Sequence, residues 1–309
     1  MILKPKRLKY GDAVALIAPS GIVREEKFKK AVRNFNEIGF LPISLNNELK
    51  NYGYLADTDE NRLIELMLFF QNDVLAEGIF CIRGGYGATR ILDQINYDIV
   101  CQNPKVFVGF SDITALQSAF FVKTGLVTFH GIVAASEFTE YVLEQINDLI
   151  VNPVENYVLP ARNMKILNEG KAEGKIVGGN LSLLTSLIGT EYLYSFQNNI
   201  VFIEEIAETP YKIDRMLNHL LMATDLKKAS AIVFGKFHRC EAEHHDSLPE
   251  ESFTIEEIIK QYFSDFKIPV VYNINFGHIK DGLIFPIGIN ASIDTEFFEI
   301  RLLETAVLK

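Results

Sequence analysis

Short apolar runs alternate with helical patterns over the first half of the chain. Residues 13–18 are apolar and are closed by Pro19-Ser20-Gly21, which predicts a buried strand. From Val23 the apolar residues take helical spacing, and Gly39 ends this predicted helix. The pattern then repeats, with strands predicted at 41–45, 78–82 and 106–110 and helices at 57–70, 89–95 and 113–122. Strands that alternate with helices predict an α/β domain whose mostly parallel sheet is flanked by helices.

The sequence changes character between residues 149 and 170. This stretch contains Asn152-Pro153 and Pro160 and has weak periodicity, which is typical of a linker. The chain beyond it has strands predicted at 174–177, 199–203, 231–234 and 270–274, a terminal strand pair at 291–303, and helices at 181–188, 211–222 and 255–263. We therefore predict an N-terminal α/β domain at 1–150, a linker at 151–170 and a strand-rich α/β domain at 171–309.

Composition and charge narrow the class of protein. The chain has 309 residues, of which 48% are hydrophobic and 23% charged, as in soluble globular proteins. A net charge of -10 argues against nucleic acid as a partner, because phosphate binding needs a basic face. Three cysteines without a C-x-x-C pair indicate a reducing compartment. No apolar run reaches about 20 residues, and 13–18 is too short for a signal-peptide core, so we predict a cytoplasmic protein and no membrane partner.

A serine stands where a buried strand meets a helix, in the segment VFVGFSDITALQSAF. Ser111 would sit on a tight turn with the N–H groups of a helix N-terminus behind it, which suits a nucleophile and a developing oxyanion. On this segment alone, capping of the helix by Ser111 or Asp112 is the commoner use of such residues. Ile113 also replaces the second glycine of the G-x-S-x-G elbow, which weakens an α/β-hydrolase assignment.

A glycine-rich turn follows another predicted strand, at Arg83-Gly84-Gly85-Tyr86-Gly87. Its backbone can approach a ligand and direct N–H groups at an anion, so it predicts either a phosphate site or an oxyanion hole. It lacks the ending of a P-loop and the spacing of a dinucleotide fingerprint. An ordinary strand-to-helix turn would account for it equally well.

A carboxylate and a histidine follow predicted strands in the second half. Glu204 ends the strand at 199–203, and His278 follows Gly277 in a loop. Strand ends are where α/β folds place their chemistry, although a solvated acidic patch and an exposed loop histidine are the simpler interpretations. His219 lies on a predicted helix, and His130 is a secondary candidate. The loop FHRCEAEHHD contains metal-ligand types, namely His238, Cys240, His244, His245 and Asp246, but its spacing matches no common zinc pattern, so we predict no metal site.

Together, these segments resemble the serine LD-carboxypeptidase family, which includes the muramoyltetrapeptide carboxypeptidases. The resemblance covers nearly the whole chain and rests on an ordered set of motifs: residues 15–20, 54–56, 62–63, 83–87, 109–113, 178–181, 202–205, 208–217, 277–278 and 286–288. It implies two domains with the active site at their junction, and a homodimer.

Residue by residue, the resemblance implies Ser111 as nucleophile, His278 as base and Glu204 as the group that orients the base. The family often has Asp after its glutamate, where this chain has Glu205, so the choice between Glu204 and Glu205 stays open. The implied reaction is acyl transfer that releases terminal D-Ala from murein tetrapeptides without a cofactor, with the oxyanion held by backbone N–H groups of Gly84, Gly85 and Asp112. Arg83, on charge grounds, and Tyr86 are candidates for binding the substrate.

Three other functions remain open at this level. A relative within the family would cleave peptidyl-nucleotide antibiotics of the microcin type and confer self-immunity. A non-catalytic binding protein on the same fold would use Ser111 only as a helix cap. A metal-dependent hydrolase would use His238, Cys240 and His244.

Overall fold

A computed structural model describes residues 2–45, 50–71, 75–244 and 252–309. The chain divides into two compact units, each with its own sheet. The first comprises residues 1–154, 284–288 and 305–309, and the second comprises residues 155–283 and 289–304. Among the residues described, no helix is long and apolar enough to cross a membrane.

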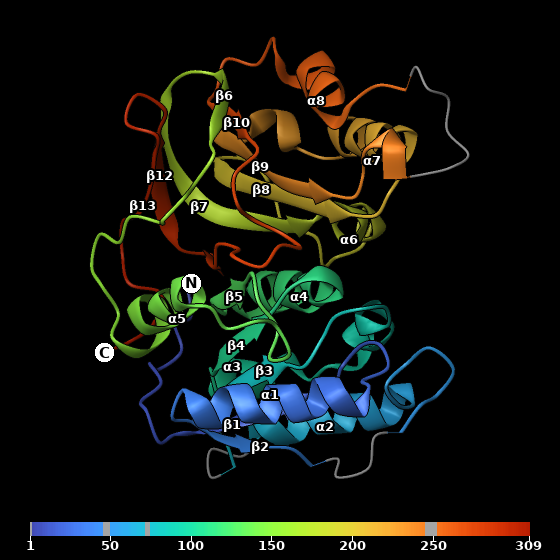
Figure 1. The fold of residues 1–309 in the computed structure, drawn as a ribbon, viewed down its shortest axis with the longest axis vertical. Helices are drawn as coiled ribbons and strands as arrows, with labels where there is room; N and C mark the ends of the chain where they lie inside the picture. The colour runs from blue at the N-terminus through green and yellow to red at the C-terminus, as the bar shows by residue number, and fades with distance from the viewer. Residues whose placement is uncertain (1, 46–49, 72–74, 245–251) are drawn as a thin grey trace. The chain divides into compact units, whose positions relative to one another are not determined.

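The first unit is built on a six-stranded sheet with the order β11-β5-β4-β3-β1-β2 (Figure 1). All neighbouring strands are parallel except β11, which pairs antiparallel with β5. The strands are β1 (Ala13–Ile17), β2 (Leu41–Ile43), β3 (Gly78–Cys81), β4 (Val106–Gly109), β5 (Thr128–His130) and β11 (Phe285–Ile287). β3 and β4 are buried along their whole length, which explains their continuous apolar sequences.

Helices join these strands. They are α1 (Glu25–Glu37), α2 (Asp59–Gln71), α3 (Tyr97–Gln102), α4 (Thr114–Thr124) and α5 (Glu140–Ile146), with the 3₁₀ helices η1 (Ala88–Gln94) and η2 (Ser111–Ile113) and the π-helical turn η3 (Asn147–Val151). α4 ends at Gly125, whose φ of +76° is the left-handed conformation that glycine adopts at helix ends. Aromatic rings of Phe70, Phe107 and Phe120 pack together in the core of this unit.

The second unit has a seven-stranded sheet with the order β13-β12-β7-β8-β9-β10-β6 (Figure 1). Its parallel centre runs from β7 to β10, and its edges are antiparallel. The strands are β6 (Lys165–Asn168), β7 (Lys171–Asn180), β8 (Asn199–Ile206), β9 (Ala231–His238), β10 (Val270–Tyr272), β12 (Asn290–Asp294) and β13 (Glu299–Leu302). The helices are α6 (Leu181–Ser186), α7 (Pro210–Ala223) and α8 (Ile255–Phe263), with short 3₁₀ turns η4 (Leu226–Lys228) and η5 (Ala242–His244). The predicted class, two α/β domains with a parallel-rich N-terminal sheet, is confirmed.

The boundaries differ from the sequence-based prediction in two respects. The stretch expected to be a linker, residues 151–170, contains β6, which pairs with β10. The edge strand β6 does not alternate apolar and polar residues, so its sequence indicated a loop. Residues 284–288 return to the first unit, where β11 pairs with β5. Such long-range pairing leaves no signal in local periodicity.

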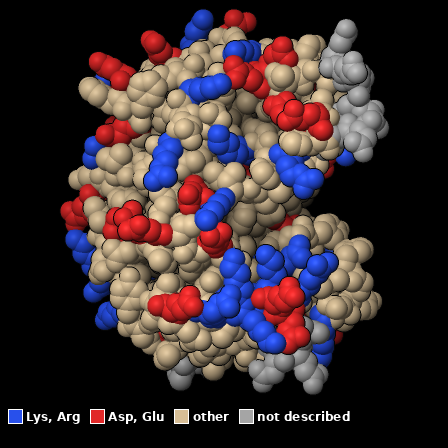
Figure 2. All heavy atoms as spheres, viewed as in Figure 1, with Lys and Arg blue, Asp and Glu red and all other residues tan. Residues whose placement is uncertain are grey.

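The surface carries both signs of charge. On the face drawn in Figure 2, several lysine and arginine side chains gather around an acidic group in the lower half of the view, and both signs of charge occur over the rest of the face. Binding of a nucleic-acid backbone requires a uniformly basic surface, and this face does not have one.

Candidate active site

Ser111 lies on a sharp turn between a strand and a helix of the first unit. β4 ends at Gly109, Phe110 is still extended, and η2 begins at Ser111. The φ angle of Ser111 is +65°, in the left-handed region that non-glycine residues rarely adopt. Such strain costs about 1–3 kcal/mol and persists only where the surroundings impose it, often at active sites. Ser111 Oγ has no hydrogen-bond partner among the described residues of its unit.

The glycine-rich turn packs directly against this serine. A Cβ on Gly84 would lie 2.9 Å from Ser111 Cβ and 3.1 Å from the Asp112 nitrogen, so only glycine permits this close approach. Gly85 follows with a φ of +118°, which again favours glycine. Two main-chain segments therefore meet beside the serine hydroxyl, as an oxyanion hole requires.

Arg83 and Tyr86 flank these two glycines. Arg83 is exposed, and it donates to the Gly84 carbonyl at 3.1 Å through Nε and to the Ile22 carbonyl at 2.9 Å through Nη1. Arg83 thus supports the loop backbone, a task that the sequence did not indicate. The ring of Tyr86 is 5.6 Å from that of Tyr54, and the two residues are 49% and 64% exposed. An exposed aromatic pair therefore stands next to the loop.

In the second unit, Glu204 and His278 form a hydrogen-bonded pair. Glu204 is fully buried near the end of β8, and its Oε2 lies 2.7 Å from His278 Nδ1. A Cβ on Gly277 would lie 2.8 Å from the same oxygen, and Gly277 has a φ of +108°. The glycine therefore lets the histidine backbone approach the carboxylate. A carboxylate at Nδ1 selects the tautomer that is protonated there and directs proton transfer to Nε2.

The neighbouring carboxylate of Glu205 has a different, structural role. It accepts hydrogen bonds from Asn180 Nδ2 at 2.8 Å, from the Ser182 N–H at 2.8 Å and hydroxyl at 2.6 Å, and from the next main-chain N–H at 2.9 Å. Burial raises the pKa of Glu205, and the hydrogen bonds from Ser182 and the backbone oppose that shift. Because successive strand residues point to opposite sides, only Glu204 faces His278.

The secondary histidine candidate, His130, has a structural partner. His130 is buried on β5, and its Nδ1 lies 2.7 Å from Gln117 Oε1. Gln117 in turn donates to the carbonyls of Gly109 at 3.1 Å and Phe129 at 2.8 Å. This chain of contacts supports the end of β4, where the serine turn begins.

The described part of the loop that contains metal-ligand types does not form a cluster. Cys240 is buried and donates to the His238 carbonyl, and His244 is exposed. His245 and Asp246 lie outside the described residues. Over the described part of the chain, no three or more His, Cys, Asp or Glu side chains gather as a metal site would require.

Comparison with known proteins defines the class of this protein. The model of the LD-carboxypeptidase N-terminal domain matches residues 14–131, and that of the C-terminal domain matches residues 173–293. The chain therefore belongs to the LD-carboxypeptidase family and is a serine carboxypeptidase, as its sequence predicted.

Individual relatives extend this assignment over the whole chain. A probable murein peptide carboxypeptidase of Bacillus subtilis is 36% identical over 94% of this chain and 92% of its own length. The microcin C7 self-immunity protein MccF of Escherichia coli is 27% identical, over 96% of this chain and 94% of its own. The crystal structure of muramoyltetrapeptide carboxypeptidase from Oxalobacter formigenes superimposes with a TM-score of 0.80 and 26% identity, covering 94% of this chain and 97% of that one.

Proposed function

We propose that this protein hydrolyses the amide that joins an L-configured residue, diaminopimelate or lysine, to terminal D-Ala in murein tetrapeptides. The observation that carries the proposal is the left-handed Ser111 at the end of β4, in a chain 36% identical to a probable murein peptide carboxypeptidase. We place it in the recycling of cell-wall peptides. The fold and chemistry fit acyl transfer.

The reaction would proceed in two halves. His278 Nε2 takes the proton of Ser111 as its oxygen attacks the carbonyl, while Glu204 orients the imidazole and stabilises its charge. Main-chain N–H groups of the Gly84–Gly85 turn and of Asp112 hold the oxyanion, and loss of one such donor typically costs about 10²–10³ in rate. D-Ala leaves with the proton from His278, and water then releases the tripeptide by the same steps in reverse order.

The test is release of D-Ala from a murein tetrapeptide, followed by mass spectrometry. The wild type should produce tripeptide, and Ser111→Ala should not. Ser186→Ala is the matched control, because this exposed serine bonds only within its own helix, to the Leu183 carbonyl. Equal silence of wild type and Ser111→Ala would refute the murein substrate, and activity of Ser111→Ala would refute the nucleophile. A chelator should leave the rate unchanged.

A second candidate is cleavage of a peptidyl-nucleotide antibiotic. Two observations favour it: the similarity to a microcin self-immunity protein, and the exposed Tyr54–Tyr86 pair, which offers a surface on which a base could stack. Comparison of kcat/KM on the two substrates separates the candidates. If the antibiotic is cleaved, Tyr86→Ala should raise its KM and leave that of the murein peptide unchanged.

We further propose that the protein acts in the cytoplasm as a homodimer. The scattered, unpaired cysteines support a reducing compartment, since Cys81 and Cys240 are buried thiols and Cys101 is an exposed one. Light scattering on the purified protein tests the dimer: the expected mass is twice the 35.0 kDa of one chain. A single-chain mass at micromolar concentration would contradict it.

A further inference from the structure

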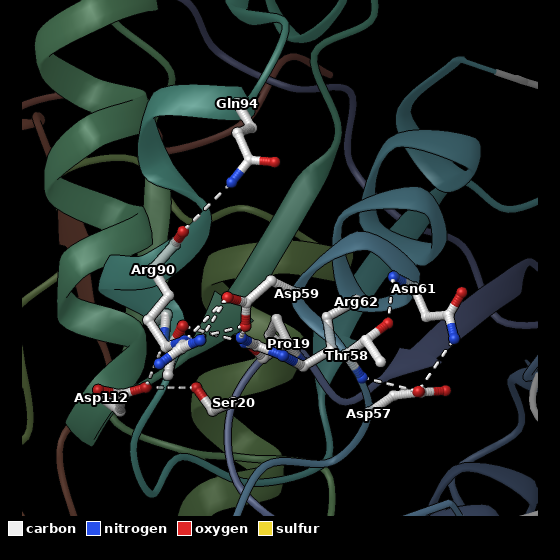
Figure 3. A network of polar contacts seen from close by, with 12 residues as sticks. Pro19, Ser20, Asp57, Thr58, Asp59, Asn61, Arg62, Arg90, Gln94 and Asp112 are labelled. Carbon is white, nitrogen blue, oxygen red and sulfur yellow. Dashed lines mark hydrogen bonds and ion pairs between the residues drawn. The ribbon is translucent and has the colours of Figure 1, made fainter. Parts of the chain in front are cut away.

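The side chain of Asp112 connects three segments that are far apart in the sequence. It is 1% exposed, directly after Ser111, and a single oxygen, Oδ2, accepts two hydrogen bonds. One comes from the Ser20 hydroxyl at 2.5 Å and the other from the Ala88 N–H at 2.8 Å (Figure 3). Asp112 thus joins the turn after β1 and the end of the glycine loop to the serine turn.

Arg62 makes a matching set of contacts from the other side. This arginine of α2 is 1% exposed, and its Nη1 donates to the carbonyl of Gly87 at 3.0 Å and, through a short bond, to that of Pro19 (Figure 3). Its Nη2 binds Asp59 at 2.5 Å, and Asp59 also binds Arg90. The buried guanidinium is retained here because carbonyls and a carboxylate accept hydrogen bonds from both of its Nη groups, although its Nε–H has no partner among the described residues.

These contacts form two adjacent clamps across the same two loops. Arg62 joins Pro19 to Gly87 through their carbonyls, and Asp112 joins Ser20 to Ala88 through their donors. The clamped residues are consecutive in both loops. The loops also touch beyond the clamps, since the Gly21 N–H donates to the Gly84 carbonyl at 3.3 Å.

From this arrangement, we propose that the carboxylate of Asp112, supported by Arg62, is a positioning group for the reaction: it holds the glycine loop against the serine turn so that N–H groups meet the oxyanion. The proposal rests on the function proposed above. Asp112 would then act twice, through its main-chain N–H at the oxyanion and through its side chain behind the loop. The Asp112 side chain is 1% exposed, so it would act from behind the loop without contacting the substrate.

The proposal separates a catalytic role from plain stability. If the clamp sets oxyanion geometry, its loss lowers kcat and leaves KM nearly unchanged, because the oxyanion exists only in the transition state. Asp112→Ala should lower kcat by about 10²-fold, as for loss of one oxyanion donor. Asp112→Asn keeps an oxygen that can accept from both Ser20 and Ala88, so it should retain activity within about tenfold.

The experiment measures kcat, KM and the melting temperature of these variants, and the rate at which a fluorophosphonate labels Ser111. Labelling needs the oxyanion hole but no murein peptide, so it tests the clamp even if the proposed substrate is wrong. The labelling rate should fall by the same factor as kcat. Asn34→Ala is the matched control, since Asn34 is also buried and bonds the carbonyls of Ala134 and Ser136, both at 2.9 Å, rather than the serine turn or residues 83–88.

The outcomes are distinct. Support requires that Asp112→Ala loses labelling and kcat at constant KM, that Asp112→Asn restores them, and that Asn34→Ala loses only melting temperature. Should Asp112→Ala fail to fold, Ser20→Ala removes one of the two donors and should slow labelling by about tenfold. Unchanged labelling in a folded Asp112→Ala or Ser20→Ala variant overturns the clamp. Labelling of the wild type without D-Ala release overturns only the murein substrate.

Discussion

The pairing of Glu204 with His278 predicts very different consequences for two adjacent carboxylates. Glu204→Gln keeps the shape of the side chain but removes the charge that, in the proposed mechanism, stabilises the imidazolium in the transition state. Oε2 and Nδ1 are 2.7 Å apart, Glu204 is fully buried, and the His278 side chain is 15% exposed, so the pair is only partly screened. With the charges centred about 4 Å apart and an effective dielectric constant of about 20, their attraction is about 4 kcal/mol.

Loss of this attraction in the transition state should lower kcat by roughly 10³-fold. The decrease in kcat should be larger still if the amide turns its NH₂ group toward Nδ1, because the imidazole would then adopt the wrong tautomer. The free energy of unfolding should change little, because the substitution preserves the volume of the side chain. The measurement is kcat for D-Ala release together with the rate of fluorophosphonate labelling.

Glu205→Gln is the matched control in the same strand. One amide oxygen cannot replace both carboxylate oxygens, and the NH₂ group would face the two donors of Ser182, which now bind Oε2 at 2.8 and 2.6 Å. The expected cost is about 2–4 kcal/mol of stability, which lowers the melting temperature by roughly 5–10 °C. At a temperature where both variants are folded, Glu205→Gln should keep activity within about tenfold. The reasoning is refuted if Glu204→Gln remains within tenfold of wild type, or if Glu205→Gln is the more impaired enzyme.

Three further predictions concern strain, packing and thiol reactivity. Ser111→Gly should abolish activity yet raise the free energy of unfolding by about 1 kcal/mol, because glycine adopts a φ of +65° without strain. Ser111→Ala keeps the strain and should not raise the free energy of unfolding. Urea unfolding of the two variants measures the difference. A Cβ on Gly178 would lie 1.9 Å from a carbonyl oxygen of β8, so Gly178→Ala should lower the free energy of unfolding by about 4 kcal/mol or more. A Cβ on Gly189 would have no atom within 4 Å, so Gly189→Ala should lower the free energy of unfolding by only about 1 kcal/mol. Burial raises the pKa of Cys240 to about 12, so its thiol remains protonated at pH 9. In the folded protein Cys240 should therefore resist iodoacetamide while the exposed Cys101 reacts. Equal labelling of the two cysteines in a peptide map would contradict this prediction.

Local sequence was enough to predict the elements of chemical interest. The apolar runs before Ser111 and Glu204 are strands buried along their length, and such runs are recognisable because both faces of a parallel sheet are covered. The ordered motifs also predicted the family. The catalytic roles of Ser111, Glu204 and His278 stay predictions that the experiments above test.

Other features depended on contacts between distant residues. The helix predicted to begin at Asp57 begins two residues later: α2 starts at Asp59, and Thr58 Oγ1 accepts from the Asn61 N–H at 3.2 Å. Two neighbouring polar residues compete for the same helix end, and propensity alone does not choose between them. β6 was missed for a related reason, since an edge strand is held by its pairing partner rather than by apolar alternation.

The sequence by itself determined the strands that lead to Ser111 and Glu204, which family the chain belongs to and which few residues carry reactive groups, because periodicity and motifs are local properties. Only the tertiary structure decided which carboxylate meets His278, since strand geometry turns Glu204 and Glu205 to opposite sides. It also decided that Arg62 and Asp112 join the same two loops behind Ser111. Hydrogen bonds between residues more than 20 positions apart follow from how strands and helices pack, and no local pattern encodes them.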